Sequence, residues 1–225
     1  MKQIIDFLAT LQSNNNRPWF QAHKAEYQAA QSRFDNFTEL LIKEIAKFDP
    51  TISGLTVKDC SYRIYRDTRF SEDKTPYKTH MGAFIVRGGK KSGYAGYYFQ
   101  VGPQEGGFPG GNLLASGHYC FEPTALKTIR EDICNGEGDF DRIVKAAPLF
   151  QLDLSDSLKR NPKGFAADAP YGEYLRLRSY CLVWEPGREA MLAPDLLQRV
   201  ADAFRTTQPF IDYVNRAIAF SRDEL

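Results

Sequence analysis

The 225-residue chain has few cysteines, few histidines, almost no net charge and no long apolar run. Its four cysteines lie far apart and form no CxxC pair, so we expect free thiols in a reducing cytosol: Cys60, Cys120, Cys134 and Cys181. A formal net charge of +1 removes the broad positive field that attracts proteins to nucleic acids and to membrane surfaces. Any basic site on this protein must therefore be local.

Membrane and export signals are also missing. No apolar run approaches the roughly 20 residues that a membrane-spanning helix needs. The first twelve residues, MKQIIDFLATLQ, carry Asp6 inside their apolar stretch and lack a small-residue cleavage site, which indicates an amphipathic helix. The last four residues, RDEL, resemble an ER-retrieval signal, but such a signal acts only on a protein that also carries a signal for entry into the ER. We expect a cytoplasmic protein with no membrane partner.

The familiar motifs of metal, nucleotide and nucleophile sites are absent as well. The chain contains no HExxH and no closely spaced set of His, Asp and Cys, although a metal held by distant residues stays an open alternative. Neither GxSxG nor SxxK occurs. The Gly-rich segment 102–111 has no GxGxxG and no GxxxxGK, which favours a flexible loop. We predict no metal and no cofactor.

The apolar residues that are present follow a helical period at both ends of the chain. A short helix is predicted over residues 4–11 and a long one from Trp19 to Phe48. Shorter helices are predicted to begin at Pro123 and at Asp139. A final helical region begins at Pro194, and we expect Pro209 to interrupt it.

The middle of the chain alternates with a period of two, which is typical of strands. The predicted strands cover Cys60 to Tyr65 and residues 81–87, 94–101, 113–121 and 174–184. Most of their connections are too short for parallel crossovers. We therefore predict one α+β domain over residues 1–225, with a mostly antiparallel central sheet and helices from both termini packed on it.

One stretch concentrates the unusual chemistry: SYRIYRDTRFSEDKTPYKTH, from Ser61 to His80. It holds five Arg or Lys residues against three carboxylates, which leaves an excess of two positive charges. In a continuous strand Arg66 would face away from Arg63 and Arg69, so the three converge only if the chain bends after Arg66. We expect such a bend and a turn at Pro76.

This charge pattern has two interpretations. Either Arg63, Arg66 and Arg69 grip a phosphate or carboxylate, with Lys74 and Lys78 as point charges and Tyr77 or Tyr65 as a hydroxyl donor. Or Asp67, Glu72 and Asp73 consume those charges in an internal ion-pair network. In the first case Asp67 would orient an arginine, and His80 would transfer protons because its ordinary pKa lies near neutrality. Separately, a lone His beside a strand is often a hydrogen-bonded structural residue, which is the alternative interpretation of His80.

The chain also resembles an uncharacterised family, found mainly in bacteria and some fungi, that is catalogued as a conserved domain of unknown function. The matching pieces are NNRPWF at 15–20, RIYRDTRFSEDKTPYKTH at 63–80, GYYFQV at 96–101 and LKRNPKGF at 158–165. The resemblance implies a single full-length domain and a role for the central motif. It places Arg17, Arg66, Lys74, Lys78 and Lys163 in shared motifs and implies no reaction.

Our leading hypothesis is a cleft, formed by the central motif and the LKRNPKG loop, that binds a phosphorylated or carboxylated small molecule. Hydrolase or transferase chemistry is an extension of this hypothesis. The alternative is a non-catalytic module that binds a protein or nucleic-acid partner through the same basic and aromatic surface. A purely structural motif is the third reading. The sequence carries no indication of oligomeric state.

Overall fold

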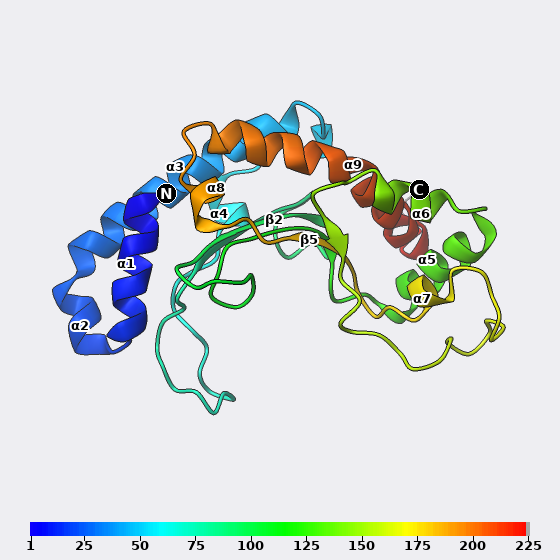
Figure 1. Ribbon diagram of the computed structural model, residues 1–225, viewed down its shortest axis with the longest axis horizontal. Coiled ribbons are helices and arrows are strands. Elements are labelled where there is room, and N and C mark those ends of the chain that lie inside the picture. Colours follow the sequence, from blue (N-terminus) through cyan, green and yellow to red (C-terminus); the bar gives the residue numbers. More distant parts are fainter. Residues whose placement is uncertain (224–225) are drawn as a thin grey trace.

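The computed structural model of the chain describes residues 1–223, and these form an antiparallel sheet covered by helices (Figure 1). The strands run in the order β1-β2-β3-β5-β4, with bounds β1 Met81–Ile85, β2 Gly96–Val101, β3 Leu113–His118, β4 Gln151–Leu152 and β5 Tyr180–Trp184. The helices are α1 Lys2–Ser13, α2 Arg17–Ala22, α3 Lys24–Ala46, η1 Pro50–Ile52, α4 Val57–Cys60, α5 Pro123–Asn135, α6 Asp139–Lys145, α7 Gly172–Leu175, α8 Arg188–Met191 and α9 Leu196–Ser221. The predicted α+β fold is confirmed.

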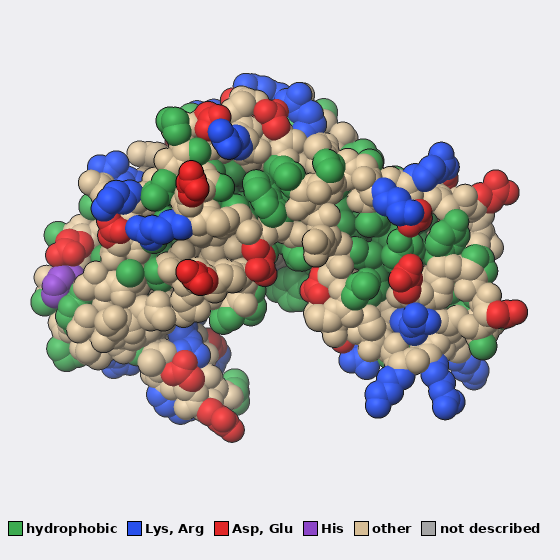
Figure 2. All heavy atoms as spheres, viewed as in Figure 1, with side chains coloured by type: hydrophobic (Ala, Val, Ile, Leu, Met, Phe, Trp, Pro, Cys, Tyr) green, Lys and Arg blue, Asp and Glu red, His purple; other side chains and the backbone are tan. Residues whose placement is uncertain are grey.

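The molecule has the outline of an arch. Helices α3 and α9 run along the outer side of the sheet, with α1 and α2 at one end and α5, α6 and α7 at the other (Figure 1). Two loops, residues 66–75 and residues 153–171, extend from the inner side at opposite ends. The space-filling view shows a hollow between these two ends, with hydrophobic side chains visible in it (Figure 2).

The core lies between the sheet and the two long helices. Tyr97, Phe99 and Leu114 project from neighbouring strands toward the helices and are completely buried. The ring of Phe99 stacks against Phe37 with ring centroids 4.9 Å apart, and Tyr97 meets Phe204 of α9 edge to face at 5.4 Å. Burial of each such side chain contributes on the order of 1.5–3 kcal/mol, so this layer holds α3 and α9 on one face.

The segment after α3 differs from the strand that was predicted to begin at Cys60. Cys60 was predicted to lie in a strand, but it ends α4, which is capped by the Thr56 hydroxyl and the Asp59 carboxylate. Residues 61–66 then run beside β1 without forming a named strand. The Tyr62 amide donates to the Gly82 carbonyl at 3.0 Å, and Ser61 pairs with Ala83 as an isolated bridge.

Three other predicted boundaries differ from the structure. The long N-terminal helix is divided at His23, where the backbone leaves the helical conformation after the Asn16-capped α2. The predicted strand at 174–184 is shorter, because Gly172–Leu175 forms α7 and only Tyr180–Trp184 joins the sheet. The interruption at Pro209 does not occur: α9 continues through it, because the buried Phe204 and Phe210 hold both sides of the helix.

The four cysteines are free thiols, as expected. Burial raises the pKa of the Cys60 and Cys181 thiols to about 12, so both stay protonated at neutral pH. Within the described part of the chain, none of the helices combines the length and apolar character that a bilayer span requires. Of the RDEL tetrapeptide, Glu224 and Leu225 lie outside the described residues.

Candidate functional site

The central motif folds as an irregular hairpin beside β1. The Lys78 amide donates to the Ile64 carbonyl at 2.8 Å, and the Arg66 amide donates to the Pro76 carbonyl at 3.0 Å. Tyr65 and Tyr77 face each other as an isolated bridge. Beyond that pair the chain turns back on itself through residues 66–75, the loop that hangs from the arch in Figure 1.

Arg66 is the internal brace of this loop. Its guanidinium donates to the Asp73 carboxylate, to the Thr75 hydroxyl, to the Thr75 carbonyl at 3.3 Å and to the Ser71 hydroxyl at 3.4 Å. The Thr75 amide and the Arg66 guanidinium together lower the pKa of Asp73 to about 2. The side chain of Arg66 is only 25% exposed, so its donors point into the loop.

Arg69 is also paired within the loop, but at the surface. Its guanidinium holds both oxygens of the Asp67 carboxylate, with Nη2–Oδ2 at 2.6 Å and Nε–Oδ1 at 3.0 Å. This contact lowers the pKa of Asp67 to about 2. Lys74 donates to the Thr68 carbonyl at 3.0 Å. Arg66 and Arg69 are therefore each paired with a carboxylate of the same loop, Asp73 and Asp67 respectively.

Three cationic or titratable side chains of the motif behave differently, because they form no ion pair. Among residues 1–223, Arg63, Lys78 and His80 form no ion pair. The Lys78 ammonium lies 5.3 Å from the centre of the Tyr62 ring. Burial, followed by the charge of Arg63, lowers the pKa of Lys78. Burial, followed by the charge of Lys78, lowers the pKa of His80 to about 4, so its imidazole is neutral at neutral pH.

These shifts describe a region of positive potential in which Lys78 and His80 have no ion-pair partner among the described residues. Partial burial of a cation lowers its pKa unless an anion compensates. An anion placed beside Arg63, Lys78 and His80 would reverse both shifts. The hairpin therefore separates two arginines that are neutralised internally from one that is not.

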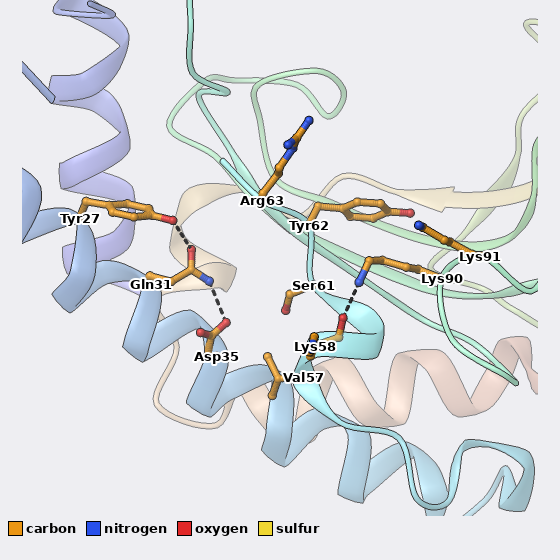
Figure 3. Close-up of a pocket in the computed structure, with 10 residues that line it drawn as sticks. All are labelled: Tyr27, Gln31, Asp35, Val57, Lys58, Ser61, Tyr62, Arg63, Lys90 and Lys91. Atoms are coloured by element: carbon orange, nitrogen blue, oxygen red, sulfur yellow. Dashed lines mark hydrogen bonds between the residues drawn. The ribbon is translucent and has the colours of Figure 1, made fainter. Parts of the chain in front are cut away.

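Arg63 and Tyr62 also line a groove of about 850 Å³ beside α3 (Figure 3). Four cations line it: Lys58 from α4, Arg63 from the hairpin, and Lys90 and Lys91 from the connection between β1 and β2. The Lys90 ammonium donates to the Lys58 carbonyl. None of the four forms an ion pair with a carboxylate of the described residues.

The opposite wall of the groove is a row of polar side chains along α3. Tyr27, Gln31 and Asp35 are spaced four residues apart, so they lie on one face of the helix (Figure 3). The Tyr27 hydroxyl donates to the Gln31 amide oxygen at 3.2 Å, and the Gln31 amide nitrogen donates to Asp35 Oδ1 at 2.8 Å. Burial raises the pKa of Asp35, and the bond from Gln31 partly offsets this.

The remaining predicted residues lie elsewhere. Tyr77 is buried, with its ring stacked on Phe20 at 3.9 Å and its backbone bonded twice to the Asn15 side chain. Arg17 is exposed at the start of α2. Lys163 is exposed in the loop that hangs from the far end of the arch (Figure 1). The LKRNPKG loop and the central motif therefore do not come together in one cleft, and that expectation was wrong.

Several residues of the groove were not among the site residues predicted from the sequence. The tandem lysines Lys90 and Lys91 stand between glycines in GGKKSG, a signal of an exposed basic turn. Tyr27, Gln31 and Asp35 have a helical spacing that was visible in the sequence. Nothing in the sequence, however, indicates that these two segments face each other. Among residues 1–223 no group of His, Cys, Asp and Glu side chains is arranged to hold a metal ion.

Comparison with known proteins gives a family but no activity. The sequence model of a family described as "Conserved hypothetical protein (DUF2461)" matches residues 3–213. No curated protein and no solved structure matches the chain. The geometry of the hairpin and of the groove is therefore the only guide to function.

Proposed function

The chain belongs to the DUF2461 family of conserved hypothetical proteins, and on that premise we propose that it binds a phosphorylated or carboxylated small molecule in the groove beside α3. Arg63, Lys58, Lys90 and Lys91 hold the anionic group, and Lys78 reinforces the positive potential from the hairpin. We propose that the protein works in the bacterial cytoplasm.

The observation that carries this proposal is the set of cations that form no ion pair. Four positive side chains line one groove, and none forms an ion pair with a carboxylate of the described residues, although Lys58 and Lys90 add to the lowering of the pKa of Asp59 by Thr56, and Arg63 adds to the lowering of the pKa of Asp67 by Arg69. Two arginines nearby in sequence, Arg66 and Arg69, are both neutralised. The contrast singles out Arg63, whose planar guanidinium suits phosphate and carboxylate oxygens. A groove of about 850 Å³ matches small ligands, which occupy pockets of roughly 300–1,000 Å³.

His80 extends the proposal from binding to hydrolase or transferase chemistry. Its imidazole is partly buried, and burial, followed by the positive charge of Lys78, lowers its pKa and keeps it neutral. A bound anion stabilises the imidazolium form and makes His80 a better proton acceptor. We propose His80 as the proton-transfer residue, and Asp67 as a residue that orients Arg69 and takes no proton.

The test is a binding measurement with inorganic pyrophosphate and with succinate as the two probes. We expect Arg63→Ala to weaken binding of the preferred probe by about 10- to 100-fold, since a hydrogen bond to a charged group contributes about 1.5–3 kcal/mol. Arg69→Ala is the matched control, because it removes an equal charge from the same hairpin, and it should change the affinity by about twofold or less. Equal losses in both variants, or no binding to the wild type, would contradict the proposal.

A second candidate function rests on Phe70, which is 96% exposed near the tip of the loop at 66–75. The Arg69 guanidinium lies 5.8 Å from the centre of its ring. A braced loop with an exposed aromatic side chain suits a non-catalytic module that contacts a protein or nucleic-acid partner. Under this reading Phe70→Ser abolishes partner capture and leaves pyrophosphate binding unchanged. Loss of both activities together would contradict two separate surfaces.

A further inference from the structure

The groove carries opposite charges on its two walls. Cations from α4, the hairpin and the β1–β2 connection line one side of the groove, where the Arg63 guanidinium is directed away from the lysines, and Asp35 of α3 lies on the other side (Figure 3). Among residues 1–223 Asp35 forms no ion pair, although four cations line the same groove. The space between the walls separates these opposite charges, so a ligand that fills it meets both.

The carboxylate of Asp35 is oriented by its neighbours. Gln31 donates to Asp35 Oδ1 at 2.8 Å, and Gln31 is itself fixed by the Tyr27 hydroxyl at 3.2 Å. Oδ2 has no protein partner within the described part of the chain. The hydrogen bonds along α3 therefore engage one carboxylate oxygen of Asp35 and leave the other as an acceptor at the wall of the groove.

Resting on the proposed function, we propose that the ligand is amphoteric: its anionic group binds Arg63 and the groove lysines, and an ammonium group at its other end binds Asp35. The chemical class is an aminoalkyl phosphate or an amino carboxylate. A purely anionic ligand of the same length has no positive group to place beside the Asp35 carboxylate. An ammonium donates to Oδ2 and supplies the counter-charge that the protein does not.

The electrostatics of the α3 wall support the assignment independently of the geometry. Burial raises the pKa of Asp35, which means that the ionised carboxylate lacks compensation in the free protein. A cation within about 4 Å of a carboxylate favours its ionised form. Gln31 alone offsets only part of the cost. The groove thus selects for a positive group at this end, as it selects for a negative group at the other.

The experiment compares matched pairs of ligands by calorimetry on the full chain. The pairs are n-alkyl phosphates and the corresponding ω-aminoalkyl phosphates with chains of two to six carbons. In the wild type we expect the amine to improve affinity by about tenfold or more at the chain length that spans the groove. Asp35→Asn, which keeps the shape and the bond from Gln31, should erase this advantage and leave the alkyl phosphate bound at least as tightly.

Glu39→Gln is the matched control, because Glu39 lies one turn further along α3 and is paired with Lys43 at 2.6 Å. It should retain the full preference for the amine. Equal affinity of the wild type for both members of every pair overturns the amphoteric ligand but leaves anion binding intact, provided that Arg63→Ala weakens both. If neither member of any pair binds, the amphoteric ligand and the proposed function fall together. Equal weakening of both members by Asp35→Asn also overturns the inference.

Discussion

Removal of Arg66 should destabilise the protein far more than removal of Arg69. Arg66 donates to Asp73, Thr75 and Ser71 from a side chain that is 25% exposed, whereas Arg69 holds Asp67 from a side chain that is 76% exposed. Hydrogen bonds to charged groups contribute about 1.5–3 kcal/mol when they are shielded. Exposed ion pairs contribute about 0–1 kcal/mol. Arg66→Ala should therefore lower the free energy of unfolding by about 1.5–3 kcal/mol, and Arg69→Ala by much less.

Thermal and urea denaturation measure this difference. In a domain of this size 1 kcal/mol shifts Tm by about 2–4 °C, so Arg66→Ala should lower Tm by about 3–12 °C. Arg66→Lys should recover little of the loss, since an ammonium does not reproduce a planar fork with several acceptors. Equal Tm values for Arg66→Ala and Arg69→Ala, or a loss of pyrophosphate binding in Arg66→Ala at unchanged Tm, would refute the view that Arg66 braces the loop.

Two further predictions concern the hairpin and the strand beside it. The pKa of His80 is about 4 in the folded protein and ordinarily about 6.5, so the unfolded chain takes up this proton first. Stability should therefore be complete above pH 6.5 and fall by at most about 3 kcal/mol as the pH drops to 4, and His80→Gln should flatten this part of the pH profile in urea unfolding. Gly82→Ala should lower Tm by several degrees, because its Cβ would lie 2.6 Å from the Tyr98 hydroxyl, which donates to Gln100. A Gly82→Ala protein with wild-type Tm would mean that Tyr98 moves without cost.

The sequence predicted the elements whose apolar residues recur with one helical or strand spacing. Residues 4–11 and the strands near 81–87, 94–101 and 113–121 were found in this way, although the strands are mostly buried on both faces. The break at His23 and the continuation through Pro209 were not found, because neither follows from periodicity. Stacking of His23 on Trp19 at 4.0 Å, and packing on both sides of Pro209, are tertiary effects that override local propensity.

The candidate site was predicted only as a local excess of charge. Counting five cations against three carboxylates correctly indicated surplus positive charge, but it did not say which arginine would stay unpaired. That depends on the loop, which brings Asp73 back to Arg66, and on Arg69 lying two residues from Asp67. The second wall of the groove comes from α3, and Lys90 and Lys91 come from another turn. These segments are far from the central motif in the sequence, so their position beside it could not be predicted.

The most direct test of the proposed anion site is the pKa of His80, measured by NMR titration of its imidazole with and without saturating pyrophosphate. The free protein should titrate near pH 4, because burial and Lys78 disfavour the imidazolium. If an anion binds at Arg63, near Lys78, this pKa should rise by about one unit or more, and Arg63→Ala should reduce the rise. An unchanged pKa in the presence of bound pyrophosphate would contradict an anion site at this cluster.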